Sequence, residues 1–364
     1  MRCVRPRDHL RTADRRGELP RNPSRPRREL HLRPHMEMAS PPPAGIYVPA
    51  PTFFASSASP SYDATTPPLD LDTQGAHAVY LARAGITGLV VLGSTGESVH
   101  VHPQDRGTLL RGVRERLDAA GFRDYPVVAG TATNGVEETV EQLVDARDAG
   151  AQWGLCLVPG YNASATTQEG IVRWFVAVAD RSPIPVLIYH YPGVSNMVKV
   201  SPATYATLAQ HPNIVGCKLS HSDVSHLAQI ALNPAVDASC FRVFTGLGQQ
   251  LLPVAAVGCV GAIDGSAGFF PKSLVRLLSL AAKTRPSDAE DRERRMLQFK
   301  VSSMEEIVVQ YGAVGIKEAV SRLRGFGDAD GTRLPLHGGI PGGNAEWAKW
   351  KGVMDAMEEV ERSL

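Results

Sequence analysis

Short apolar runs rich in β-branched residues alternate with amphipathic patterns along most of the chain. The first run, "IYVPA", begins at Ile46, and the last, "VGAID", ends at Asp264. Between the runs, apolar residues recur at helical spacing, as in Ile171, Trp174 and Val178. The predicted strands span residues 46–50, 88–93, 125–130, 154–159, 186–191, 214–219, 242–246 and 260–264.

Continuous apolar strands that alternate with helices are typical of a parallel sheet covered on its outer face. Eight such units between residues 45 and 284 predict an α/β fold, a (β/α)₈ TIM barrel. An open doubly wound sheet is the alternative, but no G-x-G-x-x-G follows the first strand, so we expect no dinucleotide site. Helix-boundary signals agree with this division, with Pro103 in a first turn and glycines at helix ends at Gly85, Gly121 and Gly150.

The strand pattern stops after residue 285. Residues 288–310, 313–325 and 344–364 read as three helices packed on the barrel. The expected organisation is therefore a disordered extension over 1–44, the barrel over 45–284 and a helical region over 285–364. The many carboxylates of residues 285–306 read as a solvated helix face, since no histidine spacing there suits a metal ion.

Charge is distributed unevenly along the chain, whose formal net charge is +1. Residues 1–36 hold eleven arginines, no lysine and four acids, a net charge of +7, which leaves −6 for the remainder. A mildly acidic body argues against nucleic acid as a partner. The Arg- and Pro-rich start lacks apolar periodicity, so we expect it to be disordered. It has no apolar segment of a secretory signal.

Location follows from the same features. No run of eighteen apolar residues is present, so no membrane span is expected. The five cysteines show no C-x-x-C spacing and fit a reduced, intracellular protein. We therefore expect a cytoplasmic protein. A mitochondrial presequence is the alternative because arginine dominates the first residues, although prolines and acids there weaken it.

The stretch "NIVGCKLSHSD" places a lysine, Lys218, near the end of an apolar strand with no acid beside it. Active sites of TIM barrels lie at the carboxyl ends of the strands. If the amine points into the barrel mouth, burial lowers its pKa, and a neutral amine forms a Schiff base with a carbonyl compound. The alternative is a lysine whose stem follows the surface and whose amine reaches solvent.

Two companions favour the chemical interpretation. Tyr189 ends the neighbouring strand, and a phenol in an apolar site can relay the protons that Schiff-base formation requires. "GSTGES", residues 93–98, offers hydroxyls and backbone N–H groups in a glycine-containing turn, a natural cradle for a carboxylate. Each also has a structural explanation, as a core tyrosine and as a plain loop. Together they describe a site for a 2-oxo acid.

The ordered set "GSTGES", "PGYN", "YHYPG" and "GCKLS" resembles the dihydrodipicolinate synthase / N-acetylneuraminate lyase family, from about Gly45 to the C-terminal helices. The resemblance implies a pyruvate-dependent lyase of class I that uses no metal and no organic cofactor. It further implies that Lys218 forms the Schiff base, that Tyr189 is the general acid and base, and that Ser94 with the backbone at Thr95 holds the carboxylate.

The same resemblance implies that Tyr161 completes the proton relay by reaching across a subunit interface. The expected assembly is then a homo-oligomer, a dimer or a dimer of dimers. Gly246 and Ile263 match positions that line the pyruvate pocket of the family. The partner is a small-molecule 2-oxo acid.

Departures from the family pattern bear on the substrate. Val194 stands where synthases carry an arginine that grips a second carboxylate, so dihydrodipicolinate synthesis is doubtful. His190 replaces the usual asparagine and is expected to be structural. Gly160 replaces an aromatic residue, which predicts a roomier mouth, and Gly268 replaces a common asparagine. "GIYVPAPTFF" with "YHYPGVSN" is closest to fungal-type members that cleave 2-keto-3-deoxy sugar acids or 4-hydroxy-2-oxoglutarate.

The leading hypothesis is an aldolase that cleaves a 2-oxo-4-hydroxy acid to pyruvate and an aldehyde, reversibly. A hydratase or dehydratase using the same lysine, a dihydrodipicolinate synthase-like condensing enzyme and a non-catalytic 2-oxo-acid-binding protein stay open. The other lysines weighed as nucleophiles, Lys199, Lys272 and Lys317, are expected at the surface. Cys217 should face away from Lys218, because side chains alternate along a strand.

Overall fold

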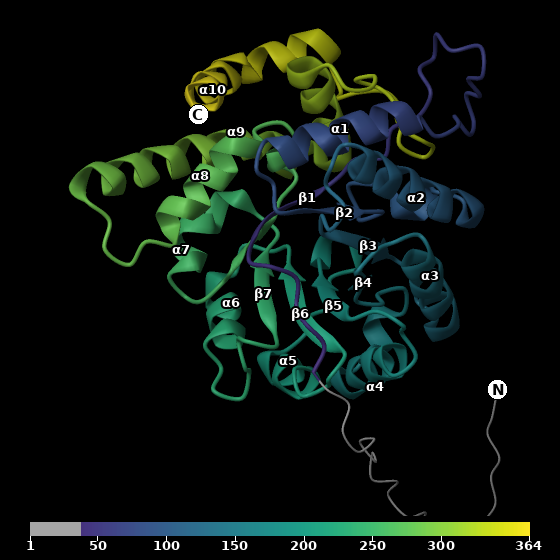
Figure 1. Cartoon of the computed structure of the whole chain (residues 1–364), viewed down its shortest axis with the longest axis vertical. Helices are drawn as coiled ribbons and strands as arrows, with labels where there is room; N and C mark the ends of the chain where they lie inside the picture. The colour runs from purple at the N-terminus through teal and green to yellow at the C-terminus, as the bar shows by residue number, and fades with distance from the viewer. Residues whose placement is uncertain (1–37) are drawn as a thin grey trace, which may run out of the picture. The chain divides into compact units, whose positions relative to one another are not determined.

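The computed structural model describes residues 38–364. Eight parallel strands pair in chain order and close into a barrel, with helices around it (Figure 1). The predicted (β/α)₈ fold is confirmed, and closure through the pairing of the first strand with the eighth excludes the open sheet. The strands are β1 (Gly45–Pro49), β2 (Gly88–Val91), β3 (Val127–Thr131), β4 (Trp153–Leu157), β5 (Val186–His190), β6 (Ile214–Leu219), β7 (Arg242–Thr245) and β8 (Gly261–Ile263).

The helices begin and end close to the predicted signals. Pro103 opens α2, and Gly85, Gly121 and Gly150 follow helix ends with φ of 89°, 93° and 87°. Glycine adopts this left-handed conformation without steric cost. The helices are α1 (Leu71–Arg83), α2 (Pro103–Ala119), α3 (Val136–Asp148), α4 (Gln168–Ala179), α5 (Pro202–Leu208), α6 (Val224–Ala231), α7 (Leu251–Ala255), α8 (Pro271–Ala281), α9 (Asp288–Arg324) and α10 (Gly343–Ser363).

The strands are buried on both faces, which explains their continuous apolar sequences. Alternate side chains fill the barrel interior, and this inner cluster includes Tyr47, Leu187, Tyr189 and Phe244. The residues between them pack outward against the helices in a second, larger cluster. Cys217, next to Lys218 on its strand, belongs to this outer cluster and is fully buried.

The C-terminal region consists of α9 and α10. Gly312, with φ 54° and ψ −132°, kinks α9, so the predicted break between two helical segments is present. α10 packs on α8 and α9. Glu361 of α10 accepts hydrogen bonds from the backbone N–H groups of Lys272 and Ser273, both at 2.9 Å, and so caps the start of α8.

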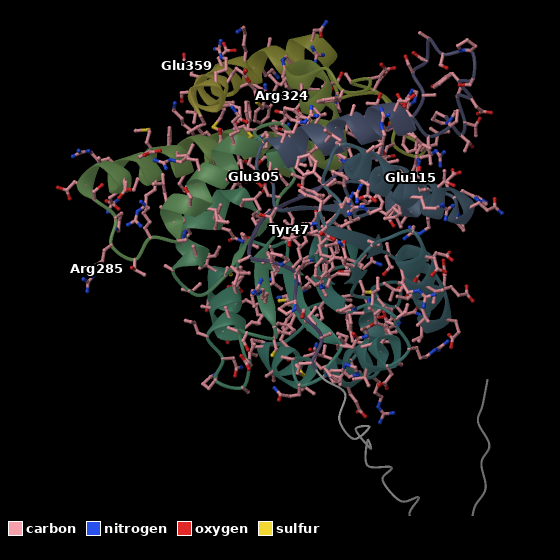
Figure 2. The ribbon with its side chains drawn as sticks, viewed as in Figure 1. Tyr47, Glu115, Arg285, Glu305, Arg324 and Glu359 are labelled. Carbon is pink, nitrogen blue, oxygen red and sulfur yellow. The ribbon has the colours of Figure 1, made fainter. Side chains whose placement is uncertain are left out.

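The sequence predicts that the carboxylates of this region face solvent, but not all of them do. Glu305 is fully buried and accepts hydrogen bonds from the backbone N–H groups of Gly248 (3.2 Å) and Gln249 (2.6 Å). Figure 2 shows it among the packed elements, whereas Arg285 projects from the loop between α8 and α9. The prediction of a wholly solvated face was wrong at this position, because a buried loop needed an acceptor for its N–H groups.

Residues 1–37, which hold most of the predicted extension, lie outside the described residues. Residues 38–44 were expected to belong to that extension, and the structure instead shows them bonded to the barrel. The carbonyls of Ser40, Pro42 and Pro43 accept hydrogen bonds from Trp153 (2.9 Å), Arg242 (2.7 Å) and Tyr47 (2.9 Å). None of the helices between residues 38 and 364 has the length and hydropathy of a transmembrane segment.

Candidate active site

Lys218 lies on β6 directly beside Tyr189 of β5, in a parallel register. Its side chain is only 4% exposed, and its Nζ lies 4.4 Å from the centre of the Tyr189 ring. Burial lowers the pKa of the Lys218 amine to about 7, and the nearby Asp264 carboxylate opposes this shift only in part. The surface-lysine interpretation is therefore wrong, and a large fraction of this amine is neutral at neutral pH.

Tyr189 connects the lysine to a serine. Its phenol oxygen lies 3.5 Å from Lys218 Nζ and 2.9 Å from Ser94 Oγ. Burial raises the pKa of Tyr189 to about 12, while hydrogen bonds from Ser94 and Ser220 act in the opposite direction. Amine, phenol and hydroxyl thus form a chain along which a proton can move.

The "GSTGES" turn leaves β2 in a strained conformation. Leu92 and Glu97 both have positive φ, 63° and 51°, which is uncommon for residues with a side chain. Among the hydrogen bonds of the described residues, the backbone N–H groups of Ser94 and Thr95 donate to no protein acceptor. Adjacent free N–H groups in a tight turn form an anion-binding concavity, which fits the predicted carboxylate cradle.

Lys317 is buried, contrary to the prediction that it is a surface residue. It is 2% exposed and forms an ion pair with Glu97, the acid of the "GSTGES" turn, while also donating to the Gly331 carbonyl. Glu97 also accepts from the backbone N–H of Arg333 at 3.1 Å. Burial lowers the pKa of Lys317, and Glu97 counteracts that effect. The pair ties the turn to α9, a long-range contact that no local pattern indicates.

Six of the predicted site residues line one cavity at the carboxyl ends of the strands. They are Ser94, Thr95, Tyr189, Lys218, Gly246 and Ile263. Leu247, which follows β7, and Tyr311 of α9 also line this cavity.

Tyr161 is the predicted site residue that stands apart. Its side chain is 80% exposed, and it lines a second cavity that shares Ser94, Tyr189 and Val194 with the first. Its backbone N–H, like that of Gly160, donates to Asn134 Oδ1 at 3.1 Å. The turn that carries Tyr161 is therefore anchored, while its phenol faces outward from the chain.

The second cavity is largely apolar and carries hydroxyl and amide side chains together with Glu97 and His100. Polar residues on it include Thr131, Thr133, Asn134 and Asn196. Among the described residues that line the two cavities, Lys218 is the only lysine or arginine. A second carboxylate on a substrate would therefore find no guanidinium partner, and no ammonium partner besides Lys218, among the described residues that line these cavities.

Of the remaining expectations from the sequence, some agree with the structure and one does not. Lys199 and Lys272 are exposed, as predicted. Gly160 does not open the mouth, because a Cβ there would lie 2.3 Å from the Ser195 carbonyl oxygen, so backbone already occupies that space. His190 is buried on the outer side of β5 and bonds to the Val198 carbonyl at 3.1 Å, which fits the structural role predicted for it.

Two groupings were not anticipated from the sequence. Glu305 lies beside Asp264, whose charge, together with burial, holds the pKa of the Glu305 carboxyl well above its usual range. His221 and His226 converge on His190 behind the site. For the histidines, the available signal was the spacing of "HSDVSH" after a strand end. The pair of Glu305 and Asp264 had no sequence signal, because the two acids are far apart in the chain.

Comparison with known proteins agrees with this geometry. The sequence profile of the Dihydrodipicolinate synthetase family matches residues 65–338. The chain belongs to this family. It is 33% identical over 320 residues to an Emericella nidulans protein named as a mitochondrial 4-hydroxy-2-oxoglutarate aldolase, covering 88% of this chain and 96% of that one. It is 35% identical to an L-threo-3-deoxy-hexylosonate aldolase of Hypocrea jecorina, covering 88% and 98%.

Solved structures of the family share the fold. A dihydrodipicolinate synthase family protein from Coccidioides immitis superposes with a TM-score of 0.74 at 30% identity, covering 89% of this chain and 99% of that one. A family member from E. coli K12, solved in complex with pyruvate, has a TM-score of 0.73 at 26% identity, covering 86% and 98%.

Proposed function

We propose that this member of the Dihydrodipicolinate synthetase family is a class I, pyruvate-dependent aldolase that cleaves a 2-oxo-4-hydroxy acid to pyruvate and an aldehyde, reversibly. The observation that carries the proposal is the buried Lys218 amine, with a pKa of about 7, within 3.5 Å of the Tyr189 phenol. The aldolase names of its relatives support the same reaction.

Each step has a residue to perform it. The neutral Lys218 amine attacks the C2 carbonyl, the carbinolamine loses water, and a protonated Schiff base forms. Its positive charge, next to the phenol, lowers the pKa of Tyr189, so the phenolate can take the proton of the C4 hydroxyl. The C3–C4 bond then breaks, its electron pair forms the enamine, and the aldehyde leaves. Protonation of the enamine at C3 and hydrolysis release pyruvate and restore the amine.

Ser94 and Thr95 would hold the carboxylate of the pyruvyl part through the free N–H groups of the turn, and Ser94 would also exchange a proton with Tyr189. Gly246 and Ile263 would line the pocket around the pyruvyl carbons. None of the steps of this mechanism calls for a metal or an organic cofactor. The Lys218 amine acts as the nucleophile, the protonated Schiff base accepts the electron pair of the breaking bond, and the Tyr189 phenol serves as acid and base.

Tyr161 would act in an assembly. An exposed tyrosine whose backbone is anchored beside the active site is available to a second copy of the chain. Two inactive variants, Tyr161→Phe and Lys218→Ala, should recover activity when mixed and reassembled, because some sites then combine two intact halves. Absence of recovery would place the tyrosine in its own chain's relay or outside the reaction.

The substrate is best matched by a sugar-derived acid with an uncharged, hydroxylated end. The amide- and hydroxyl-lined second cavity can bond to hydroxyls, and it offers no lysine or arginine for the second carboxylate of 4-hydroxy-2-oxoglutarate. Val194, 47% exposed, occupies the mouth where a synthase would need an arginine. Condensation of pyruvate with glyceraldehyde should therefore be more efficient than with glyoxylate; the reverse order would assign the chain to the oxoglutarate reaction.

A mitochondrial location is preferred to the cytoplasmic one. Two relatives carry the word mitochondrial in their names, and residues 1–36 are rich in arginine. Imaging of a fusion of the whole chain to a fluorescent protein checks this, with removal of residues 1–36 as the control.

Trapping tests the reaction class directly. Incubation with pyruvate and borohydride should add one reduced pyruvyl group to the peptide that contains Lys218, and Lys218→Ala should prevent it. Lys272→Ala, at an exposed site, is the matched control and should be modified normally. An adduct on another lysine, or none at all, would exclude the mechanism.

A further inference from the structure

Three histidines meet behind the candidate active site. His190 ends β5, His221 follows β6, and His226 lies on α6. Their ring centroids are 5.0 to 5.8 Å apart, and one nitrogen of each ring lies within 4.8 Å of a nitrogen of the other two.

Backbone contacts indicate which nitrogen carries the proton in two of these rings. His190 Nε2 donates to the Val198 carbonyl at 3.1 Å, and His226 Nε2 donates to the Val200 carbonyl at 2.9 Å. Each ring therefore carries its proton on Nε2 and presents an unprotonated Nδ1. Metal-binding histidines are commonly oriented in this way, through a hydrogen bond from the distant ring nitrogen to a carbonyl.

His190 Nδ1 is the observation that points to a ligand. The side chain is 98% buried, and this nitrogen has no hydrogen-bond partner among the described residues. A buried polar atom without a partner is costly, and natural proteins seldom leave one unless something binds there. The His190 ring packs edge-on against the rings of His221 and His226.

We propose that His190, His221 and His226 bind one divalent zinc ion through three imidazole nitrogens, with water or an exogenous anion as the fourth ligand. Imidazole suits zinc, and a tetrahedral site with Zn–N of about 2.0–2.1 Å places its nitrogens roughly 3.3 Å apart. His221 Nε2 and His226 Nδ1 are already 3.0 Å apart. The ligand nitrogens all lie within 4.8 Å of one another, so the His190 ring would have to approach the other two to reach the tetrahedral spacing.

Binding exchanges two hydrogen bonds for three metal bonds. In the metal-free cluster His221 Nε2 donates to His226 Nδ1, while His221 Nδ1 accepts a long contact, 3.3 Å, from the Asp223 N–H. When Nε2 binds zinc, the proton of His221 shifts to Nδ1, and both contacts are lost. No oxidant or reductant is involved, and all three ligands stay neutral.

The ion would act as a structural clip and take no part in the reaction. It lies on the outer side of β5 and β6, whereas Tyr189 and Lys218 face the barrel interior. It would join two strand ends, α6 and, through the two backbone carbonyls, residues 198–200. Those are the segments that hold the candidate catalytic lysine and tyrosine in register.

The test uses the full chain, stripped with a chelator, and titrated with Co²⁺ and Zn²⁺. Tetrahedral Co²⁺ shows intense visible absorption, so we expect those bands to appear at one ion per chain and to vanish when Zn²⁺ displaces cobalt. His221→Gln and His226→Gln should each weaken binding by at least about 100-fold, since each removes one of three ligands. The variants retain polar side chains at half-buried sites.

Controls separate this site from other histidines. His337→Gln, at an exposed position, and the combined variant of His9, His31 and His35 to Gln should bind cobalt with unchanged intensity. Zinc should raise the Tm of the protein and of these controls by several degrees and leave that of His221→Gln unmoved. Absence of the bands, or bands that persist in both cluster variants, would show a hydrogen-bonded histidine trio and overturn the zinc site. Loss of pyruvate trapping on chelation would overturn its structural role.

Discussion

The Lys218 amine lies 3.5 Å from the Tyr189 phenol oxygen because β5 and β6 place the two residues side by side in a parallel register. Both groups are buried, and burial disfavours the charged form of each, so it lowers the pKa of the lysine and raises that of the tyrosine. Near pH 7 the phenol is therefore neutral, and so is a large fraction of the amine in the free protein. In the proposed mechanism, the positive charge formed on the Schiff base would lower the pKa of the phenol.

The rate of Schiff-base formation should rise with pH through about 7, because only the unprotonated Lys218 amine attacks the carbonyl. Single-turnover trapping of pyruvate from pH 5.5 to 8.5 measures this rate. The rate should increase about tenfold for each pH unit below the midpoint and level off above it. A midpoint near the ordinary lysine value would mean that the amine is solvated in solution.

Lys218→Met should abolish turnover and stabilise the fold. In the folded state the pKa of Lys218 is lowered, so the unfolded chain binds more protons between about pH 7 and 10.5, and the wild type loses stability as pH falls through that window. A buried methionine has no such dependence. Urea unfolding should show the variant more stable by about 1 kcal/mol or more at pH 7, with the difference shrinking towards pH 10. A less stable variant at pH 7 would contradict the burial of a costly amine.

Tyr189→Phe should separate the two halves of the reaction. The variant keeps the lysine and the cradle, so the pyruvyl adduct should still form, although more slowly. Cleavage should fall by about 10²- to 10⁴-fold, the usual contribution of a positioned acid or base. Ser220→Ala is a useful comparison, since it removes a hydrogen bond to the phenol and leaves the phenol in place. Equal losses of trapping and cleavage in Tyr189→Phe would point to a collapsed site.

The barrel was predictable from the sequence because local patterns determine it. Runs such as "VLIYHY" and "IVGCKL" are apolar throughout, as strands buried on both faces must be, and glycine at helix ends marks the boundaries. Strand register follows from closing the barrel. For that reason the proximity of Lys218 and Tyr189 could be inferred from two separate strand ends.

Contacts that bring distant parts of the chain together were not predictable. Lys317 sits in a helical pattern that looks solvated, and its partner Glu97 lies 220 residues away. Glu305 likewise appears to be one of many surface acids until its loop partners are known. Periodicity reports which face of a helix is apolar, and it does not report a buried charge whose stabilising partner comes from elsewhere.

Val194→Arg should shift the aldehyde preference. Val194 borders both cavities, and the residues that line them include no lysine or arginine besides Lys218. A guanidinium there could pair with the carboxylate of glyoxylate. Condensation kinetics should show a lower KM for glyoxylate, roughly tenfold, and a higher one for glyceraldehyde. Val194→Leu is the control for size and should change neither preference. An arginine without effect on either aldehyde would place the acceptor elsewhere.

The buried pair of Glu97 and Lys317 should stabilise the "GSTGES" turn. Glu97→Gln leaves Lys317 without its counter-charge, and Lys317→Met does the same to Glu97, so each single change should cost about 3–5 kcal/mol of unfolding free energy. The double variant should cost clearly less than the sum, because it leaves no unpaired charge. Urea denaturation of the four proteins measures this coupling.

The KM for pyruvate should rise more than kcat falls in the double variant, since Ser94 and Thr95 sit on the same turn. Additive losses of stability would mean that the two side chains do not interact in solution, and an unchanged KM would separate the ion pair from the carboxylate cradle.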